Sequence, residues 1–167
     1  MLWTSNIDLY PTLSELVGVE VPEDVKGRSF YPLLKGEEYK EREHIFSELT
    51  YHDCYNAMRA IRTRKWKFIM NFETIPTRFE IPIGFASTES TEIYIKQNPD
   101  FNIPIEEEEL YDLENDPFEM KNLANKHEYS KIKGSLKTML VQWLEETNDP
   151  ILNGKIAAPP ESLDALD

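Results

Sequence analysis

The sequence predicts an α+β fold, in which a small group of β-strands is followed by one long C-terminal helix. Strand-like runs follow one another between His44 and Phe72. From Tyr129 onward, apolar residues recur at steps of three and four, the pattern of a helix with one buried face. We expect this helix to bury one apolar face, and a shorter helix to precede the strands.

The opening of the chain predicts the short helix. Proline is tolerated only in a first helical turn, so Pro11 places the start near Leu9 or Tyr10. Gly18 is the expected stop. We expect Asp8 to cap and orient this helix rather than to bind metal. The apolar stripe that must cover another surface consists of Leu9, Leu13, Leu16 and Val17.

Residues 19–42 are predicted to form a loop that wraps a neighbouring surface. Val21-Pro22 and Lys26-Gly27 are turn signals, and an apolar patch runs from Phe30 to Leu34. A long irregular segment with several apolar anchors is typical of chain that lies across another surface.

The clearest strands follow this loop. We predict strands at His44–Tyr51, Met58–Thr63 and Trp66–Phe72, with the polar residues 63–65 joining the last two as a hairpin. Strand alternation assigns two sets of side chains to opposite faces of the last run. One set is Trp66, Phe68, Met70 and Phe72, and the other is Lys67, Ile69 and Asn71.

The second half contains an insertion, a strand and the long helix. Residues 73–108 show no periodicity and contain several prolines. Glu109–Leu113 is a predicted short strand that leads into a turn. We therefore divide the chain into residues 1–42, a domain at 43–150 with the insertion at 73–108, and a tail at 151–167. The periodic residues of the helix are Tyr129, Ile132, Leu136, Met139, Leu140, Trp143 and Leu144.

Composition excludes several classes of partner and site. The formal charge is -13, from 31 acidic and 18 basic residues, which argues against nucleic acid or an anionic membrane as a partner. No apolar run approaches the ~20 residues that cross a bilayer, and the sequence shows no signal-peptide pattern. Cys54 is the single cysteine, so neither an internal disulfide nor a thiolate metal site can form.

Three segments carry a family resemblance. The first joins Ser5–Leu13 to Lys26–Leu34, the second is Met58–Ile69, and the third is Glu109–Leu123. In this order they resemble the C-terminal portion of the sulfatases, members of the alkaline phosphatase-like superfamily. The stretch Ser47–Arg59 resembles the heparan N-sulfatase branch.

The resemblance implies a topology and a division of labour. Sulfatases have a large α/β domain, to which residues 1–42 would belong, and a smaller domain with a four-stranded antiparallel sheet against one long helix. The family uses calcium and a formylglycine made in a Cys/Ser-x-Pro-x-Arg segment, which this sequence lacks. We therefore expect the catalytic residues to precede Met1 in an intact protein, and this chain to be inactive alone. Family members are often exported or lysosomal.

The resemblance also suggests substrate contacts. Sulfated sugar or aryl sulfate would be the substrate of the intact protein, and the small domain closes one side of its pocket. His52 and Glu48 are candidates for that wall, although a turn histidine and a solvated acid are the simpler interpretations. Arg59 and Arg62 have a fork suited to sulfate. Their spacing along a strand points them to opposite faces, and pairing with nearby acids is the alternative for each.

Two other functions stay open from sequence. The chain could be a free-standing module that binds sulfated glycans or a protein through the hairpin from Arg59 to Lys67. It could also belong to a phosphodiesterase-like relative in the same superfamily. Exposed apolar surface on the first helix and on Phe30–Leu34 would favour a homo-oligomer.

Overall fold

A computed structural model of the chain describes residues 3–51, 55–74, 88–97 and 104–157. The chain divides into two compact units, unit 1 (Met1–Ile45) and unit 2 (Phe46–Asp167). This division lies close to the predicted boundary after residue 42. That the first unit belongs to a larger domain stays a prediction. Because the two units are separate bodies, each is described by itself.

Unit 1 contains a 3₁₀ turn, η1 (Asn6–Asp8), followed directly by α1 (Leu9–Val17) and later by α2 (Tyr31–Leu34). Helix α1 starts at Leu9 as predicted, and Gly18 ends it in a left-handed conformation with φ 71°. The predicted wrapping loop is wrong over α2, which forms one helical turn there. Pro32 lies in the first turn of α2, where its fixed φ suits a helix.

A buried carboxylate organises unit 1. Asp8 accepts hydrogen bonds from the backbone N–H of Ser5 at 2.8 Å and of Arg28 at 2.7 Å, and from the guanidinium of Arg42. Burial alone would raise the pKa of Asp8, but the bonds from Arg42, Arg28 and Ser5 outweigh it and lower that pKa. Asp8 therefore bonds back to Ser5 in a capping box at η1 and orients the segments around it, whereas its side chain makes no capping hydrogen bond to α1 itself.

Close backbone approach completes the same unit. The Thr12 hydroxyl donates to the Asp8 carbonyl and accepts the N–H of Phe30 at 3.0 Å. A Cβ at Gly27 would lie 2.0 Å from the carbonyl oxygen of Ile7, so only glycine fits there. The two halves of the first family motif are thus joined by direct contacts.

Unit 1 keeps its apolar stripe exposed. Leu9 is 51% exposed, Leu13 56% and Val17 70%. Among the described residues of this unit, the buried ones are Asp8, Pro11, Thr12 and Ser14. Whether this surface forms a homo-oligomer stays a prediction.

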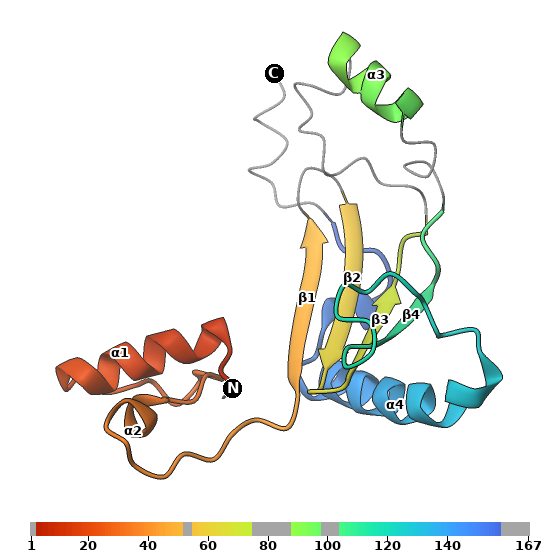
Figure 1. Cartoon of the computed structure of the whole chain (residues 1–167). Helices are drawn as coiled ribbons and strands as arrows, with labels where there is room; N and C mark the ends of the chain where they lie inside the picture. The colour runs from red at the N-terminus through yellow and green to blue at the C-terminus, as the bar shows by residue number, and fades with distance from the viewer. Residues whose placement is uncertain (1–2, 52–54, 75–87, 98–103, 158–167) are drawn as a thin grey trace. The chain divides into compact units, whose positions relative to one another are not determined.

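Unit 2 is built on a four-stranded sheet in the order β1-β2-β3-β4 (Figure 1). The pairs β2–β3 and β3–β4 are antiparallel, with Arg62 opposite Lys67 and Phe68 opposite Leu110. The strands are β1 (Ile45–Tyr51), β2 (Tyr55–Arg62), β3 (Trp66–Asn71) and β4 (Glu108–Asp112). The predicted strands and the α+β class are confirmed.

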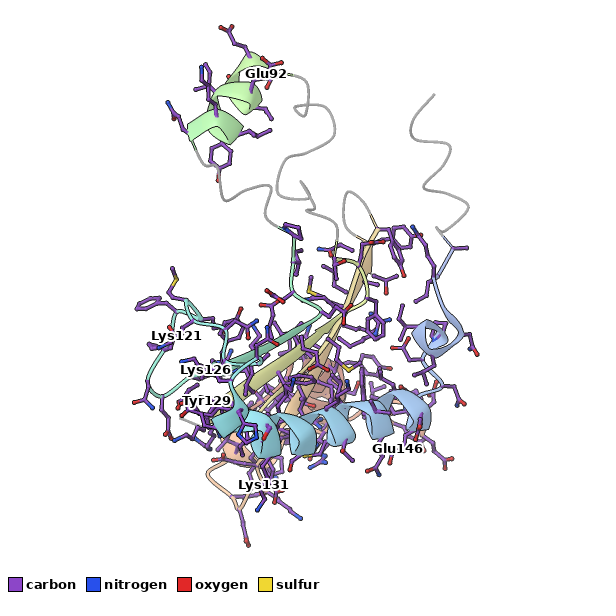
Figure 2. All side chains as sticks on the ribbon, turned by 90° about the vertical axis from the view of Figure 1, so that its right-hand side faces the viewer. Glu92, Lys121, Lys126, Tyr129, Lys131 and Glu146 are labelled. Carbon is purple, nitrogen blue, oxygen red and sulfur yellow. The ribbon has the colours of Figure 1, made fainter. Side chains whose placement is uncertain are left out.

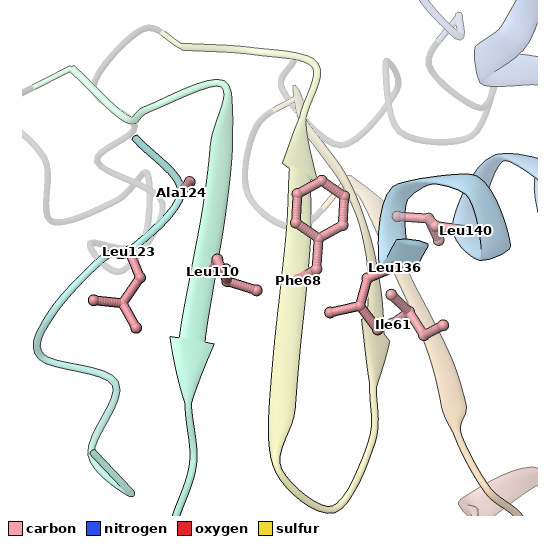
Figure 3. Packing of buried hydrophobic residues seen from close by; sticks show 7 residues of the cluster. All are labelled: Ile61, Phe68, Leu110, Leu123, Ala124, Leu136 and Leu140. Carbon is pink, nitrogen blue, oxygen red and sulfur yellow. The ribbon is translucent and has the colours of Figure 1, made fainter. Parts of the chain in front are cut away.

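Helix α4 (Ser130–Glu146) packs its apolar face against the sheet (Figure 3). Figure 2 labels Lys131 near its start and Glu146 at its end. The predicted faces of β3 are also confirmed, because Phe68 belongs to this core whereas Ile69 lies in a separate cluster with Ala60 and Tyr111. The buried residues of this core are Ile61, Phe68, Leu110, Leu123, Ala124, Leu136 and Leu140.

At the outer edge of β4, the side chain of Asn122 makes the backbone hydrogen bonds that a neighbouring strand would make. Asn122 accepts the N–H of Leu110 at 2.9 Å and donates to the carbonyl of Glu108 at 3.1 Å. The backbone N–H of Leu123 then bonds the Leu110 carbonyl at 2.8 Å. This part of the third family motif therefore satisfies the polar groups of an edge strand.

Two elements depart from the predictions. Helix α3 (Glu89–Gln97) lies in the insertion that we predicted to be irregular, while residues 75–87 and 98–103 lie outside the described structure. A 3₁₀ helix, η5 (Pro150–Asn153), opens the predicted tail. Among the helices of the described residues, none combines the length and apolar character needed to traverse a membrane.

Candidate functional site

The predicted site lies where β1 ends and β2 begins (Figure 1). His52 falls in residues 52–54, outside the described structure. Glu48 stands on β1 with its side chain 63% exposed, and its Oε2 lies 3.8 Å from Nε of Arg59. The structure thus brings Glu48 and Arg59 together on neighbouring strands. Their contact with a substrate stays a prediction.

Arg59 is buried, with 2% of its surface exposed, and is fully engaged. Its Nε and Nη2 bond the two carboxylate oxygens of Asp149 at 2.6 and 3.0 Å. Nη1 donates to the carbonyls of Leu49 at 2.8 Å and Met58 at 2.9 Å, and Nη2 also reaches Thr50 Oγ1 at 3.2 Å. Because a guanidinium has five N–H donors, these bonds use them all. Arg59 therefore fixes the end of β1.

Asp149, the partner of Arg59, also accepts several hydrogen bonds. Besides Arg59, it accepts the backbone N–H of Ile151 at 2.9 Å. Burial alone would raise the pKa of Asp149, but the bonds from Arg59 and Ile151 outweigh it and lower that pKa. Asp149 therefore stays ionised at neutral pH, and its bonds to Arg59 join β2 to the chain that follows α4.

Arg62 is not part of this arrangement. It is the last residue of β2 and is exposed, whereas Arg59 is buried under the chain after α4. The structure does not bring the two arginines together, and the substrate contact predicted for Arg62 stays a prediction.

The site includes residues that sequence reasoning missed. The rings of Tyr51 and Tyr55 meet edge to face, with centroids 5.2 Å apart and planes at 64°. The Nζ of Lys155 lies 4.4 Å from the centroid of the Tyr55 ring. The Tyr51 hydroxyl donates to the carbonyl of Ile156 at 2.8 Å. An aromatic pair therefore joins the end of β1 to the start of β2, with an ammonium over one of its rings.

The segment 149–156, which we call the C-terminal strap, brings Lys155 to this place. Ile151 is buried against Ala57 and Leu144, and Ile156 packs in the same cluster beside Tyr55. The strap thus runs from the Asp149–Arg59 pair to the start of β2. No local sequence signal indicates this contact, because it joins two ends of unit 2.

A cavity of about 350 Å³ lies elsewhere in unit 2. Carboxylate-bearing residues line much of it, which disfavours an anionic ligand. Among the residues that the structure describes, no three acidic, histidine or cysteine side chains converge as a metal site. That the calcium and formylglycine of the family belong to a longer family member stays a prediction. The cavity lining is Thr74, Ile105, Glu106, Glu107, Glu108 and Asn125.

Comparison with known proteins gives a consistent result. The family model for "N-sulphoglucosamine sulphohydrolase, C-terminal" matches residues 2–98, more than half of the chain. An ulvan-active sulfatase of Formosa agariphila is 31% identical over 91% of this chain and 31% of its own length. A Delta 4,5-hexuronate-2-O-sulfatase of Bacteroides thetaiotaomicron is 29% identical over 96% of this chain and 27% of its own length.

Solved structures resemble the same region. A 2-O GAG sulfatase superposes with a TM-score of 0.63 at 28% identity, over 92% of this chain and 27% of that one. A structure in complex with its substrate D-glucosamine-2-N,6-O-disulfate gives 0.59 at 25% identity, over 86% of this chain and 24% of that one. The chain thus spans about a third or less of the length of these relatives.

Proposed function

The chain belongs to the sulfatase family, in its C-terminal portion, and on that premise we propose that it forms the substrate-side subdomain of a hydrolase of sulfated sugars. The observation that carries this proposal is the organised end of the sheet. There, a fully bonded buried arginine fixes the strand that bears Glu48, immediately before residues 52–54. Such support for side chains at a strand end is what a pocket wall requires.

In our proposal, the residues that cleave the sulfate bond do not lie on this chain. The sequence contains no Cys/Ser-x-Pro-x-Arg segment, so it offers no precursor of formylglycine. We assign calcium and formylglycine to a longer family member. The subdomain would shape and select the substrate, and would show no turnover alone.

A sulfated sugar is favoured over an aryl sulfate as the substrate class. Relatives are named for ulvan, hexuronate and N-acetylglucosamine sulfates, and one solved relative holds D-glucosamine-2-N,6-O-disulfate. Tyr51 and Tyr55 at the sheet end supply aromatic surface of the kind that packs against a sugar ring.

The two alternative functions receive less support. A basic binding face along the hairpin from Arg59 to Lys67 is weakened because Arg59 pairs with Asp149 and Lys67 pairs with Glu119. A phosphonate monoester hydrolase of Agrobacterium radiobacter is similar at 20% identity, which shows the shared fold alone.

Two experiments test the proposal on the chain as it stands. With 4-nitrophenyl sulfate and added calcium, we expect no enzyme-like release of nitrophenol, and turnover would refute the assigned role. In a ¹H–¹⁵N NMR titration with D-glucosamine-2-N,6-O-disulfate, we expect saturable shifts at amides of residues 48–59, and weaker ones with glucosamine. A folded chain without saturable shifts there would remove the substrate-side assignment.

A further inference from the structure

We propose that Lys155 and Tyr55 together form a recognition site for a sulfate group carried on a sugar. The ammonium would bind the sulfate, and the exposed part of the Tyr55 ring would pack on the apolar face of the sugar. This inference rests on the proposed function and adds two specificity-determining residues to it.

The first argument is the unmatched charge of Lys155. Lys35 lies over the ring of Tyr31 and Lys65 lies over that of Trp66, but each also pairs with a glutamate, Glu37 or Glu114. Lys155 lies over Tyr55 at 4.4 Å, closer than either, and has no carboxylate partner within the described parts of the chain. An aromatic face directs an ammonium without neutralising it. Within the described residues, no carboxylate therefore neutralises the charge of Lys155, which can attract an anion.

The second argument is the fixed position of the ring beneath it. Tyr55 packs against the buried cluster of Ala57, Leu144 and Ile151. The rings of Tyr51 and Tyr55 contact each other in a T-shaped arrangement, and the Tyr51 hydroxyl donates to the Ile156 carbonyl of the strap. A platform that is already ordered loses little entropy when a ligand settles on it.

The third argument is the location. Tyr55 is the first residue of β2, and it follows residues 52–54 directly. The Asp149–Arg59 pair anchors the other end of the strap to the same strand. The ammonium and the ring therefore lie at the end of the sheet where β2 begins, on the strand next to the one that carries Glu48.

Substitutions of Lys155 in the intact chain test this site. We would titrate ¹⁵N-labelled chain with D-glucosamine-2-N,6-O-disulfate and follow the amides of Tyr55 and Ile156. Lys155→Ala is expected to weaken binding about fivefold, the size of one solvent-exposed charge contact. Lys155→Arg keeps the charge and is expected to bind as the parent does. Added salt should remove the difference between Lys155→Ala and the parent.

A matched control comes from the other end of unit 2. Lys131 lies in the first turn of α4, next to Tyr129, whose ring packs on Trp66 at the start of β3 (Figure 2). In an antiparallel sheet this is the end opposite Tyr55. Lys131→Ala also removes one charge, and we expect it to leave binding unchanged.

The contribution of the Tyr55 ring to the proposed site is tested separately. Tyr55→Phe keeps the ring and should retain affinity, whereas Tyr55→Leu should weaken it. An unchanged ¹⁵N spectrum away from the site confirms that each variant is folded. Saturable binding with equal affinity in the parent and Lys155→Ala would overturn this inference while leaving the proposed function standing. Absence of saturable shifts at residues 48–59 in the parent would instead remove the proposed function.

Discussion

Each unit contains a buried aspartate that is paired with an arginine, but the surroundings of the two pairs differ. In unit 1, Asp8 accepts the backbone N–H groups of nearby Ser5 and of distant Arg28 as well as bonds from Arg42. In unit 2, Asp149 holds Arg59, whose every donor is engaged, beside a core of buried aliphatic and aromatic side chains. The buried residues described in unit 1 are mostly small or polar.

This difference indicates what each aspartate–arginine pair contributes to its unit. In unit 1 the ion pair replaces a core, because the large apolar side chains of α1 stay exposed. In unit 2 the sheet and α4 already supply a core, so the pair serves to place the end of β1 and the strap. Loss of the Asp8–Arg42 pair should therefore have different consequences from loss of the Asp149–Arg59 pair.

The largest effect is expected from Arg59→Ala. It would leave Asp149 buried without its partner, which costs about 3–5 kcal/mol of unfolding free energy. Urea denaturation of unit 2, followed by tryptophan fluorescence, measures this loss. The double variant Arg59→Leu with Asp149→Leu should be considerably less destabilised, because no charge is left unpaired. Equal losses in the single and double variants would contradict the assigned pairing.

The next effect is expected from Gly27→Ala in unit 1. The added methyl would collide with the Ile7 carbonyl, so the two segments that meet at Asp8 must separate. Amide hydrogen exchange at Arg28 and Phe30 should then lose its protection, while amides in α4 keep theirs. Unchanged protection at Arg28 would show that unit 1 does not depend on this close approach.

Acid should affect both units through their aspartates. The folded-state pKa of Asp8 and of Asp149 is lowered, below an unfolded value of about 3.9. Their contribution is therefore complete above that value and is lost as pH falls through each folded pKa. Hydrogen exchange of the Arg28 and Ile151 amides should quicken below about pH 4, relative to Leu140 in α4. Protection that is independent of pH there would contradict the carboxylate contacts.

The smallest effect is expected from Gly134→Ala within α4. Nothing lies within 4 Å of the position that a Cβ would occupy, so the change should be tolerated. It should raise the stability of unit 2 by about 0.5–1 kcal/mol, because alanine is the better helix former. Urea denaturation of unit 2 measures the gain, and a loss of stability would contradict the open space around Gly134.

Much of the fold could be predicted from the sequence because its signals are local. The alternation of β3, the turn at residues 63–65 and the spacing along α4 each depend on neighbours in the chain. Helix α3 was missed because its segment mixes Ser, Thr and β-branched isoleucines, which are poor helix formers.

The candidate site was harder to predict because its contacts are not local. Arg59 was interpretable as a sulfate ligand or as half of an ion pair, and only the fold shows Asp149 beside it. Lys155 lies in a segment that we predicted as a tail, so nothing in the sequence connected it to Tyr55. Family resemblance located the region around Glu48 and His52, whereas the supporting residues required coordinates.

Because Asn122 covers β4, the two edges of the sheet differ in how readily they can pair with another strand. With the N–H and carbonyl of Leu110 already occupied, a visiting strand finds little to pair with on that side. Strand β1 is the other border of the sheet, and in the described chain it has only β2 as a neighbour. If another polypeptide extends this sheet, it must therefore do so alongside β1, the strand that carries Glu48.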